Sequence, residues 1–261
     1  MKRFSLIFTT IILLSCFSAR AQFVDSQPGL LQMPNAVMEE NGTFMITNNY
    51  INKNALPTSG WGYDTFSYGF NLTFWSRLDV SYVCTIFDGK RRPNPGPVDL
   101  IMFNQDRHFA GRFQLLKEGE FGIKWMPSVV VGVSDPTTGA SSGGYVDMDV
   151  SSGNGYFNRY YVAASKHFNT PWGQVGGHLA YQYNQRADYA LNGPCVGINW
   201  RPIWVRDILI IDDVNLIAEY DSRTFNMGFI ASIWDNRFEA MFELQNMKWI
   251  NFGLRFKVRM K

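Results

Sequence analysis

The feature that most constrains the fold of this chain is an alternation of large apolar residues with small or polar ones. Between Thr65 and Phe74 every second residue is large and apolar, and the residues between them are Thr, Ser, Gly and Asn. Successive side chains of a strand point to opposite faces, so this period of two predicts a strand with one apolar face. The same pattern returns at 78–86, 225–233, 238–245 and 250–260.

Weaker alternation elsewhere brings the expected number of strands to about twelve, within a range of roughly 10–14. The weaker strands are expected to begin near Thr43, His108, Ser128, Tyr156, Gln174, Pro194 and Val214. Their connections differ in length: 234–237 predicts a tight turn, 204–213 a short helix or a turn, and 88–106 and 135–155 long loops rich in Gly, Pro and Ser. Short periplasmic turns and long outer loops are typical of transmembrane barrels.

Two architectures share this alternation, because a soluble β-sandwich turns its apolar faces inward and a transmembrane β-barrel turns them towards lipid. The polar positions here are rich in Ser, Thr, Asn, Gln and Gly, and many aromatic residues fall near strand ends. Aromatic girdles at two membrane interfaces account for that distribution. We therefore predict an all-β fold, an antiparallel transmembrane β-barrel, although the chain ends in Met260-Lys261 rather than in an aromatic residue.

The start of the chain predicts a signal peptide that is removed from the mature protein. Lys2 and Arg3 form its charged part, residues 6–14 its apolar centre, and Ala19-Arg20-Ala21 its cleavage site. The next stretch contains Pro and Gly without sustained alternation. The chain thus divides into a signal peptide at 1–21, an irregular N-terminal segment at 22–41 and an outer-membrane barrel at 42–261.

Charge and cysteine content argue against several classes of function. Loss of Lys2, Arg3 and Arg20 lowers the 24 basic residues to 21 against 22 acidic ones, so nucleic-acid binding has no electrostatic basis. After residue 21 no apolar run approaches the roughly 18 residues that a membrane-spanning helix needs. Cys84 and Cys195 lie in predicted strands and are interpreted as small apolar packing residues, not as a disulfide or zinc site.

Few residues are arranged for catalysis or metal binding. Of the three histidines, His108, His167 and His178, the last two lie in strand-like contexts without Cys or carboxylate partners at metal-ligand spacing, so no metal and no cofactor is expected. Ser165 and His167 share one face of a predicted strand, but a nucleophile and base also need an orienting acid, which sequence cannot place. The chain is therefore expected not to be an enzyme, with a barrel lipid hydrolase as the lesser alternative.

Charged residues on the polar face of the predicted strands are expected to line the lumen. They are Arg112, Lys166, Arg186, Glu219, Asp221, Glu239, Glu243, Arg255 and Lys257. Enclosed charges either pair into a rigid filling or line a hydrated path. Side chains nearly fill small barrels, so we expect a narrow or closed pore. The candidate loop contacts for a sugar are Tyr145, Tyr156 and Tyr160, because aromatic rings can stack on sugar faces.

Several motifs, in order along the chain, resemble a known family. They begin with residues 29–36 (GLLQMPNA) and 40–43 (ENGT), and continue at 113–118, 127, 131–135, 160–166 (YYVAASK), 192–194, 219–222 (EYDS) and 226–228. Together they resemble the YjbH-like exopolysaccharide-associated outer-membrane proteins over essentially the whole mature chain. Many members of that family are longer, so this chain resembles a compact single-barrel form. The resemblance implies an outer-membrane location and a role in polysaccharide export or surface assembly.

The main functional expectation is a non-enzymatic outer-membrane β-barrel of a Gram-negative bacterium, involved in exopolysaccharide or surface polysaccharide secretion or in envelope organisation. One alternative is a structural or adhesion barrel without an export role, and another is a secreted β-sandwich that binds carbohydrate. The expected partners are outer-membrane lipid, lipopolysaccharide, the barrel assembly machinery, the exported polysaccharide and other secretion components. Nucleic acid is not an expected partner.

Overall fold

The computed structural model describes residues 23, 25–55, 64–91, 100–136, 146–148, 157–184, 191–205, 208 and 210–260. Its strands are β1 (Thr43–Ile51), β2 (Thr65–Phe74), β3 (Leu78–Arg91), β4 (Leu100–Leu116), β5 (Ser128–Ser134), β6 (Val146–Met148), β7 (Arg159–Thr170), β8 (Gly173–Tyr183), β9 (Gly193–Pro202), β10 (Ile211–Tyr220), β11 (Phe225–Ile233), β12 (Phe238–Gln245) and β13 (Trp249–Arg259). Two 3-10 turns, η1 (Glu120–Gly122) and η2 (Ile203–Val205), lie between strands. No helix in these described ranges is long and apolar enough to cross a membrane.

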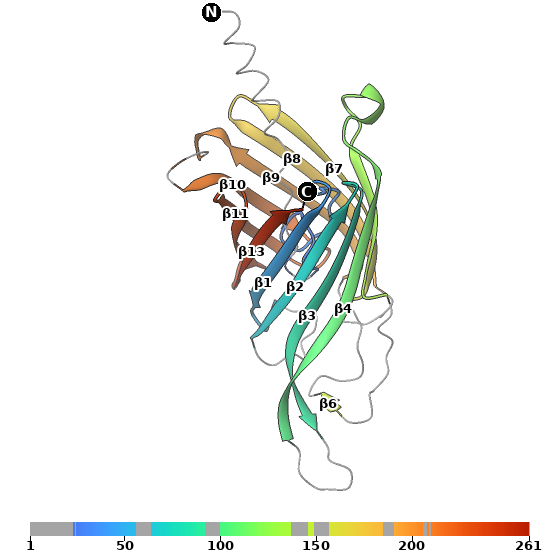
Figure 1. Ribbon diagram of the computed structural model, residues 1–261, viewed down its shortest axis with the longest axis vertical. Coiled ribbons are helices and arrows are strands. Elements are labelled where there is room, and N and C mark those ends of the chain that lie inside the picture. The colour runs from blue at the N-terminus through green and yellow to red at the C-terminus, as the bar shows by residue number, and fades with distance from the viewer. Residues whose placement is uncertain are drawn as a thin grey trace, which may run out of the picture.

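Twelve of the strands form one closed antiparallel barrel (Figure 1). Each pairs with the next along the chain, except that β5 pairs with β7 and β13 returns to pair with β1. The seam between β1 and β13 runs from Thr43 opposite Arg259 to Tyr50 opposite Phe252. The short β6 pairs with the far end of β3. The predicted antiparallel barrel of about twelve strands is therefore confirmed, and the alternative of a β-sandwich is wrong.

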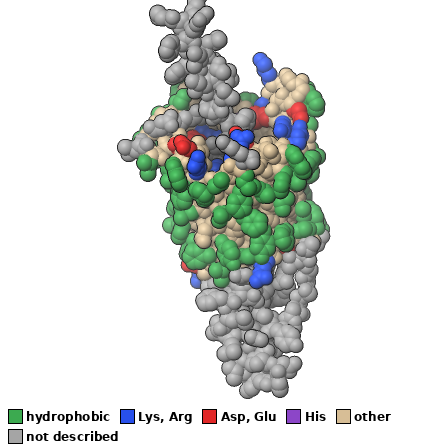
Figure 2. Space-filling model, viewed as in Figure 1, with side chains coloured by type: hydrophobic (Ala, Val, Ile, Leu, Met, Phe, Trp, Pro, Cys, Tyr) green, Lys and Arg blue, Asp and Glu red, His purple; other side chains and the backbone are tan. Residues whose placement is uncertain are grey.

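The alternation of the strands separates a polar lumen from an apolar outer surface. In β2, Ser67 and Asn71 have no exposed surface, whereas Phe66 is 46% exposed and Phe70 43% exposed. A sandwich would bury these phenylalanines, but here they point outward. Figure 2 shows hydrophobic side chains as a band over the visible face of the barrel, with charged side chains gathered beyond its upper edge. This band is the surface that a membrane-spanning barrel presents to lipid.

The two rims of the barrel differ. We call the rim at which β1 begins and β13 ends the chain-end rim, and it carries the short turns at 75–77, 171–172 and 234–237. The exposed Trp75, Trp172, Trp204 and Trp234 lie at this rim, as an interfacial aromatic girdle does. The opposite rim, the long-loop rim, carries the connections 52–64, 92–99, 135–158 and 184–192.

Some strands extend further than the sequence pattern predicts. The composition of 88–106 indicated a loop, but β3 and β4 stay paired as far as Arg91 and Leu100. The expected loop at 135–155 contains β6, and the expected helix or turn at 204–213 contains η2 and the start of β10. Backbone pairing beyond the lipid needs no apolar face, so the alternation ends before the strands do.

The N-terminal segment lies inside the barrel. Its described residues between 23 and 41 contain no strand or helix. Phe23, Leu31 and Met33 are fully buried among the inner faces of the strands. Figure 1 shows this blue segment enclosed by the sheet. We call residues 23–41 the plug, because they fill the lumen.

Candidate functional site

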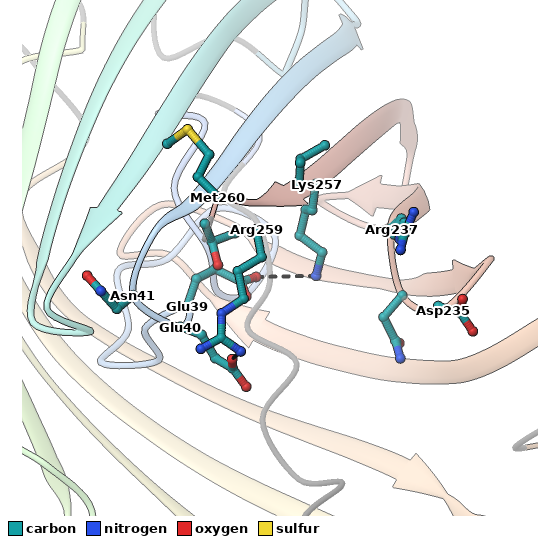
Figure 3. Close-up of a pocket in the computed structure, with 11 residues that line it drawn as sticks. Glu39, Glu40, Asn41, Asp235, Arg237, Lys257, Arg259 and Met260 are labelled. Carbon is teal, nitrogen blue, oxygen red and sulfur yellow. Dashed lines mark hydrogen bonds and ion pairs between the residues drawn. The ribbon is translucent and has the colours of Figure 1, made fainter.

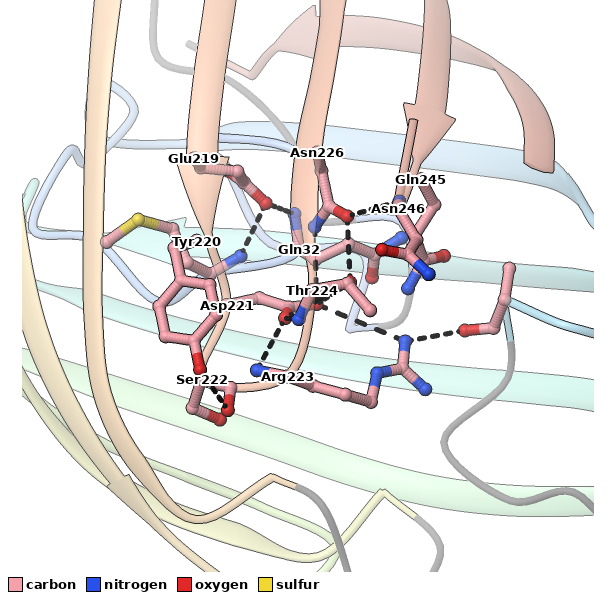
Figure 4. A network of polar contacts seen from close by, with 12 residues as sticks. Gln32, Glu219, Tyr220, Asp221, Ser222, Arg223, Thr224, Asn226, Gln245 and Asn246 are labelled. Carbon is pink, nitrogen blue, oxygen red and sulfur yellow. Dashed lines mark hydrogen bonds and ion pairs between the residues drawn. The ribbon is translucent and has the colours of Figure 1, made fainter. Parts of the chain in front are cut away.

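The plug is held most closely by one carboxylate of the inner wall. The backbone amides of Leu31 and Met33 each donate to Glu219 of β10 at 3.0 Å, and the amide of Gln32 donates at 2.5 Å (Figure 4). Three successive amides can converge on one carboxylate only where the backbone turns sharply. Gly29 begins this turn with φ +148°, and a Cβ there would lie 1.5 Å from Nδ2 of Asn35. The turn at the start of the plug therefore requires glycine.

A second acidic residue holds the Gln32 side chain. Glu243 of β12 accepts hydrogen bonds from Nε2 of Gln32 at 2.8 Å and from Nδ2 of Asn251 at 2.7 Å. Nearby, Asp221 accepts the backbone amides of Arg223 and Thr224 and closes the tight turn between β10 and β11. Figure 4 shows Gln32 of the plug and Glu219 beside the turn of Asp221, Arg223 and Thr224 at the long-loop rim.

Two buried arginines hold other parts of the plug. Arg112 of β4 pairs with Asp79 at 2.8 Å and donates to the backbone oxygens of Asn35 and Val37. Arg159 of β7 pairs with Asp25 of the plug. Arg159 also donates to the backbone oxygen of Gln32 at 3.2 Å. The wall therefore satisfies plug amides with carboxylates and plug carbonyls with guanidinium groups, as buried polar groups require.

Near the chain-end rim the last plug residues meet a chain of ion pairs. Lys257 of β13 lies between Glu39 of the plug, at 3.3 Å, and Glu239 of β12, at 2.6 Å. Arg255 pairs with the same Glu239 at 2.9 Å. The plug thus contacts charged wall residues along its whole length, from Asp25 to Glu39.

The plug also has an apolar half. Phe23, Leu30, Leu31 and Met33 form one buried cluster with the wall residues Cys195, Ile217, Ile230 and Met241. Gly197 of β9 provides space for it, because a Cβ at that position would lie 2.6 Å from Sδ of Met33. Among the described residues, Cys84 and Cys195 are both free, so no disulfide joins the plug to the wall. Among the described residues the plug is held in the lumen by packing, hydrogen bonds and ion pairs.

Ser165, one of the two residues of the hydrolase alternative, pairs with a different histidine from the expected His167. Its Oγ lies 2.8 Å from Nδ1 of His178, whose Nε2 lies 2.8 Å from Oδ1 of Asn199. Ser165 Oγ also accepts the backbone amide of Ala36 at 2.9 Å, and the serine is 1% exposed. The plug therefore covers the serine and uses it as an anchor.

His167 instead binds the connection between β4 and β5 at the chain-end rim. Glu118 lies 2.8 Å from Nδ1 of His167 and accepts hydrogen bonds from the His167 amide and from Nζ of Lys166, each at 3.0 Å. Burial disfavours the charged form of Glu118. The hydrogen bonds from His167 and Lys166 outweigh this effect and hold the pKa of the carboxyl below its usual value of 4.5.

This lowered pKa predicts how the Glu118 contact depends on pH. A carboxyl with a depressed folded pKa stabilises the protein above its usual pKa, and it loses that contribution as the pH falls through the folded value. We expect Glu118→Gln to lower the free energy of unfolding by about 1 kcal/mol or less at pH 7. The difference from the unmodified protein should be fully present above the usual pKa of 4.5 and should shrink as the pH falls below it, as denaturant titrations in detergent at several pH values would show. A difference that stayed the same from neutral pH to the acid end of the titration would contradict an ionised Glu118.

Most of the charged residues predicted for the lumen lie there. Buried positions on the inner face of the strands or in their turns are occupied by Arg112, Glu219, Asp221, Glu239, Glu243, Arg255 and Lys257. Lys166 lies at the chain-end rim, paired with Glu118. Tyr160 lies within β7 rather than in a loop, and its ring is 37% exposed. Arg186, Tyr145 and Tyr156 lie outside the described residues.

Sequence reasoning missed the plug, with its Asp25, and the wall residues Asp79 and Arg159. The available signal was a set of apolar residues on the polar face of the strands. Ile230 and Met241 interrupt the polar positions of β11 and β12, and they pair directly across those strands. Such residues would be exposed in a water-filled lumen, so their presence indicates an apolar partner inside the barrel.

Comparison with known proteins finds a family model that matches nearly the whole chain. The family model described as YjbH, exopolysaccharide biosynthesis protein YbjH, matches residues 24–260. No curated protein matches the chain. Among solved structures, LpxR from Salmonella typhimurium has 10% sequence identity and a TM-score of 0.39, over 82% of this chain and 99% of that one. The beta domain of the Bordetella autotransporter BrkA has 12% identity and a TM-score of 0.32, over 85% of this chain and 100% of that one.

Proposed function

The chain belongs to the YjbH family of exopolysaccharide biosynthesis proteins, and from that premise we propose that it is a non-catalytic barrel serving exopolysaccharide secretion in the outer membrane of a Gram-negative bacterium. In its resting state the plug closes the lumen. Passage of a polymer, or of a segment of it, requires the plug to move.

The observation that carries this proposal is the way in which the plug is held. Glu219 accepts hydrogen bonds from three plug amides. Arg112 and Arg159 donate hydrogen bonds to plug carbonyl oxygens. Hydrogen bonds of this kind contribute about 0.5–3 kcal/mol each. They can break and re-form without any change to a covalent bond. If side chains of the strands alone filled the lumen, the lumen could open only if the barrel unfolded. A plug formed by a separate chain segment can leave the lumen while the barrel stays intact.

The proposal is tested in cells that produce the polymer. Deletion of the gene should abolish or strongly reduce surface polysaccharide, measured by sugar analysis of the washed cell surface, and the unmodified gene should restore it. The protein should fractionate with the outer membrane and migrate differently on SDS gels with and without boiling, as closed barrels do. Normal polymer on the deleted strain would favour the structural or adhesion barrel instead.

A second candidate function, lipid hydrolysis, is favoured by one observation, the hydrogen-bonded series Ser165, His178 and Asn199. A serine, a base and an orienting amide in this order are the parts of a nucleophilic site. Against it, Ala36 of the plug covers Ser165. If the site is catalytic, purified protein should release fatty acid from lipid A or phospholipid, and Ser165→Ala should abolish the release. No release by the unmodified protein would leave Ser165 as a plug anchor.

A further inference from the structure

A cavity of about 750 Å³ opens at the chain-end rim, where the plug leaves the lumen (Figure 3). Its lining comes from three parts of the fold that are distant in sequence. They are the last plug residues with the start of β1 (39–41 and Thr43), the turn between β11 and β12 (235–237), and the end of β13 (257–260). The volume is in the range of sites that hold small molecules.

The charges of this rim cavity balance. Glu39 pairs with Lys257, and Glu40 pairs with Arg259. The two remaining charged residues, Asp235 and Arg237, are both exposed, and neither forms an ion pair within the described part of the chain. The guanidinium of Arg237 lies over the Trp234 ring, 5.8 Å from its centre. The cavity therefore offers one open carboxylate and one open guanidinium with no net charge.

Such a lining favours a neutral ligand that both donates and accepts hydrogen bonds. Because the lining has no net charge, the cavity has no overall electrostatic attraction for an anion or for a cation. A hydroxyl group can donate to the carboxylate or accept from the guanidinium. Val258 and Met260 add apolar surface to the same lining, and the C–H faces of a sugar ring can pack on such surface. We propose that the rim cavity binds a neutral, hydroxyl-rich segment of a saccharide chain.

The position of the cavity gives this binding a consequence for the plug. Glu39, Glu40 and Asn41 of the plug form part of the lining, so a bound saccharide touches the plug just before β1 begins. It lies beside Lys257 and Arg259, the wall residues that pair with Glu39 and Glu40 at the end of the plug. The inference rests on the proposed function, because it assigns a binding site to the polysaccharide that is proposed to pass through the barrel.

Titration calorimetry with the full-length protein in detergent tests the proposal. The probes are the neutral hexasaccharides of glucose and mannose and, for comparison, acidic hexagalacturonate. At least one neutral hexasaccharide should bind saturably at millimolar concentration or below. Asp235→Ala and Arg237→Ala should each weaken it about tenfold or more, since a hydrogen bond to a charged group contributes about 1.5–3 kcal/mol. Lys248→Ala, at an exposed cation of the opposite rim, should leave the affinity unchanged.

Three results would overturn the inference: no saturable binding of any neutral probe, tighter binding of hexagalacturonate, or affinity that neither cavity variant alters. The heat-dependent shift on SDS gels verifies that each variant is a closed barrel. Loss of polymer on the deleted strain without saccharide binding would refute the rim site and keep the proposed function. Binding without a polymer defect would support the rim site as a sugar site and refute the export role.

Discussion

Replacing Gly197 by leucine is expected to displace the plug from the lumen, so that a closed barrel becomes one that conducts ions. A Cβ at Gly197 would lie 2.6 Å from Sδ of Met33 and 2.7 Å from Cδ1 of Leu30, so a leucine side chain and the seated plug need the same space. Overpacking of this kind costs about 1–3 kcal/mol, which shifts the balance towards the displaced plug about 5- to 150-fold. In planar lipid bilayers the variant should show conductance steps that the unmodified protein lacks.

The matched control is Gly177→Leu in the neighbouring strand β8. Gly177 faces outward, and a Cβ there has no atom within 4 Å, so the same substitution adds only lipid-facing surface. If Gly197→Leu does not fold, Glu219→Ala provides a second route, because it removes the acceptor of three plug amides without adding bulk. Closed barrels in both Gly197→Leu and Glu219→Ala, or equal conductance in Gly177→Leu, would contradict a displaceable plug.

The largest loss of stability is expected from Arg112→Ala. Arg112 and Asp79 are fully buried and 2.8 Å apart, and Arg112 also donates to the plug carbonyl of Asn35. Removal of the guanidinium leaves a buried carboxylate without its cation, which costs about 3–5 kcal/mol. The temperature at which the folded band disappears from SDS gels should fall markedly, and denaturant titration should give the lost free energy of unfolding.

Arg259→Ala is the control for this loss. Arg259 pairs with Glu40, but both side chains are largely exposed, and an exposed ion pair contributes about 1 kcal/mol or less. The two variants remove the same side chain and differ in burial. Equal losses of stability would show that burial of the Arg112 and Asp79 pair has no energetic consequence.

The strands were predictable because lipid and lumen impose opposite chemistry on alternate residues. Phe66 and Phe70 point to lipid while Ser67 and Asn71 point inward, so the sequence of β2 alternates between apolar and polar residues. The same parity placed Arg112 and Glu219 on the inner face. Strand ends were harder to predict, because β3 stays paired with β4 as far as Arg91, beyond the end of the alternation at Ile86.

Contacts within the lumen depend on register and on the plug, and parity alone predicts neither. Ser165 and His178 are direct partners across the hairpin of β7 and β8, whose turn is at 171–172. If the turn at 171–172 is located first in the sequence, the hairpin register places His178, not His167, opposite Ser165. No local pattern could show that Leu31 and Met33 lie inside the barrel, because their partners are about 190 residues away in sequence.

The seam between β1 and β13 also has a consequence for biogenesis. The inner wall presents Ile217, Ile230 and Met241 to the interior, where they form one buried cluster with Phe23, Leu30, Leu31 and Met33 of the plug. The plug immediately precedes β1, one of the two strands that meet at the seam. A sheet that closed on water would lose this hydrophobic gain. The plug therefore acts as a template around which β13, the last strand, closes the barrel against β1.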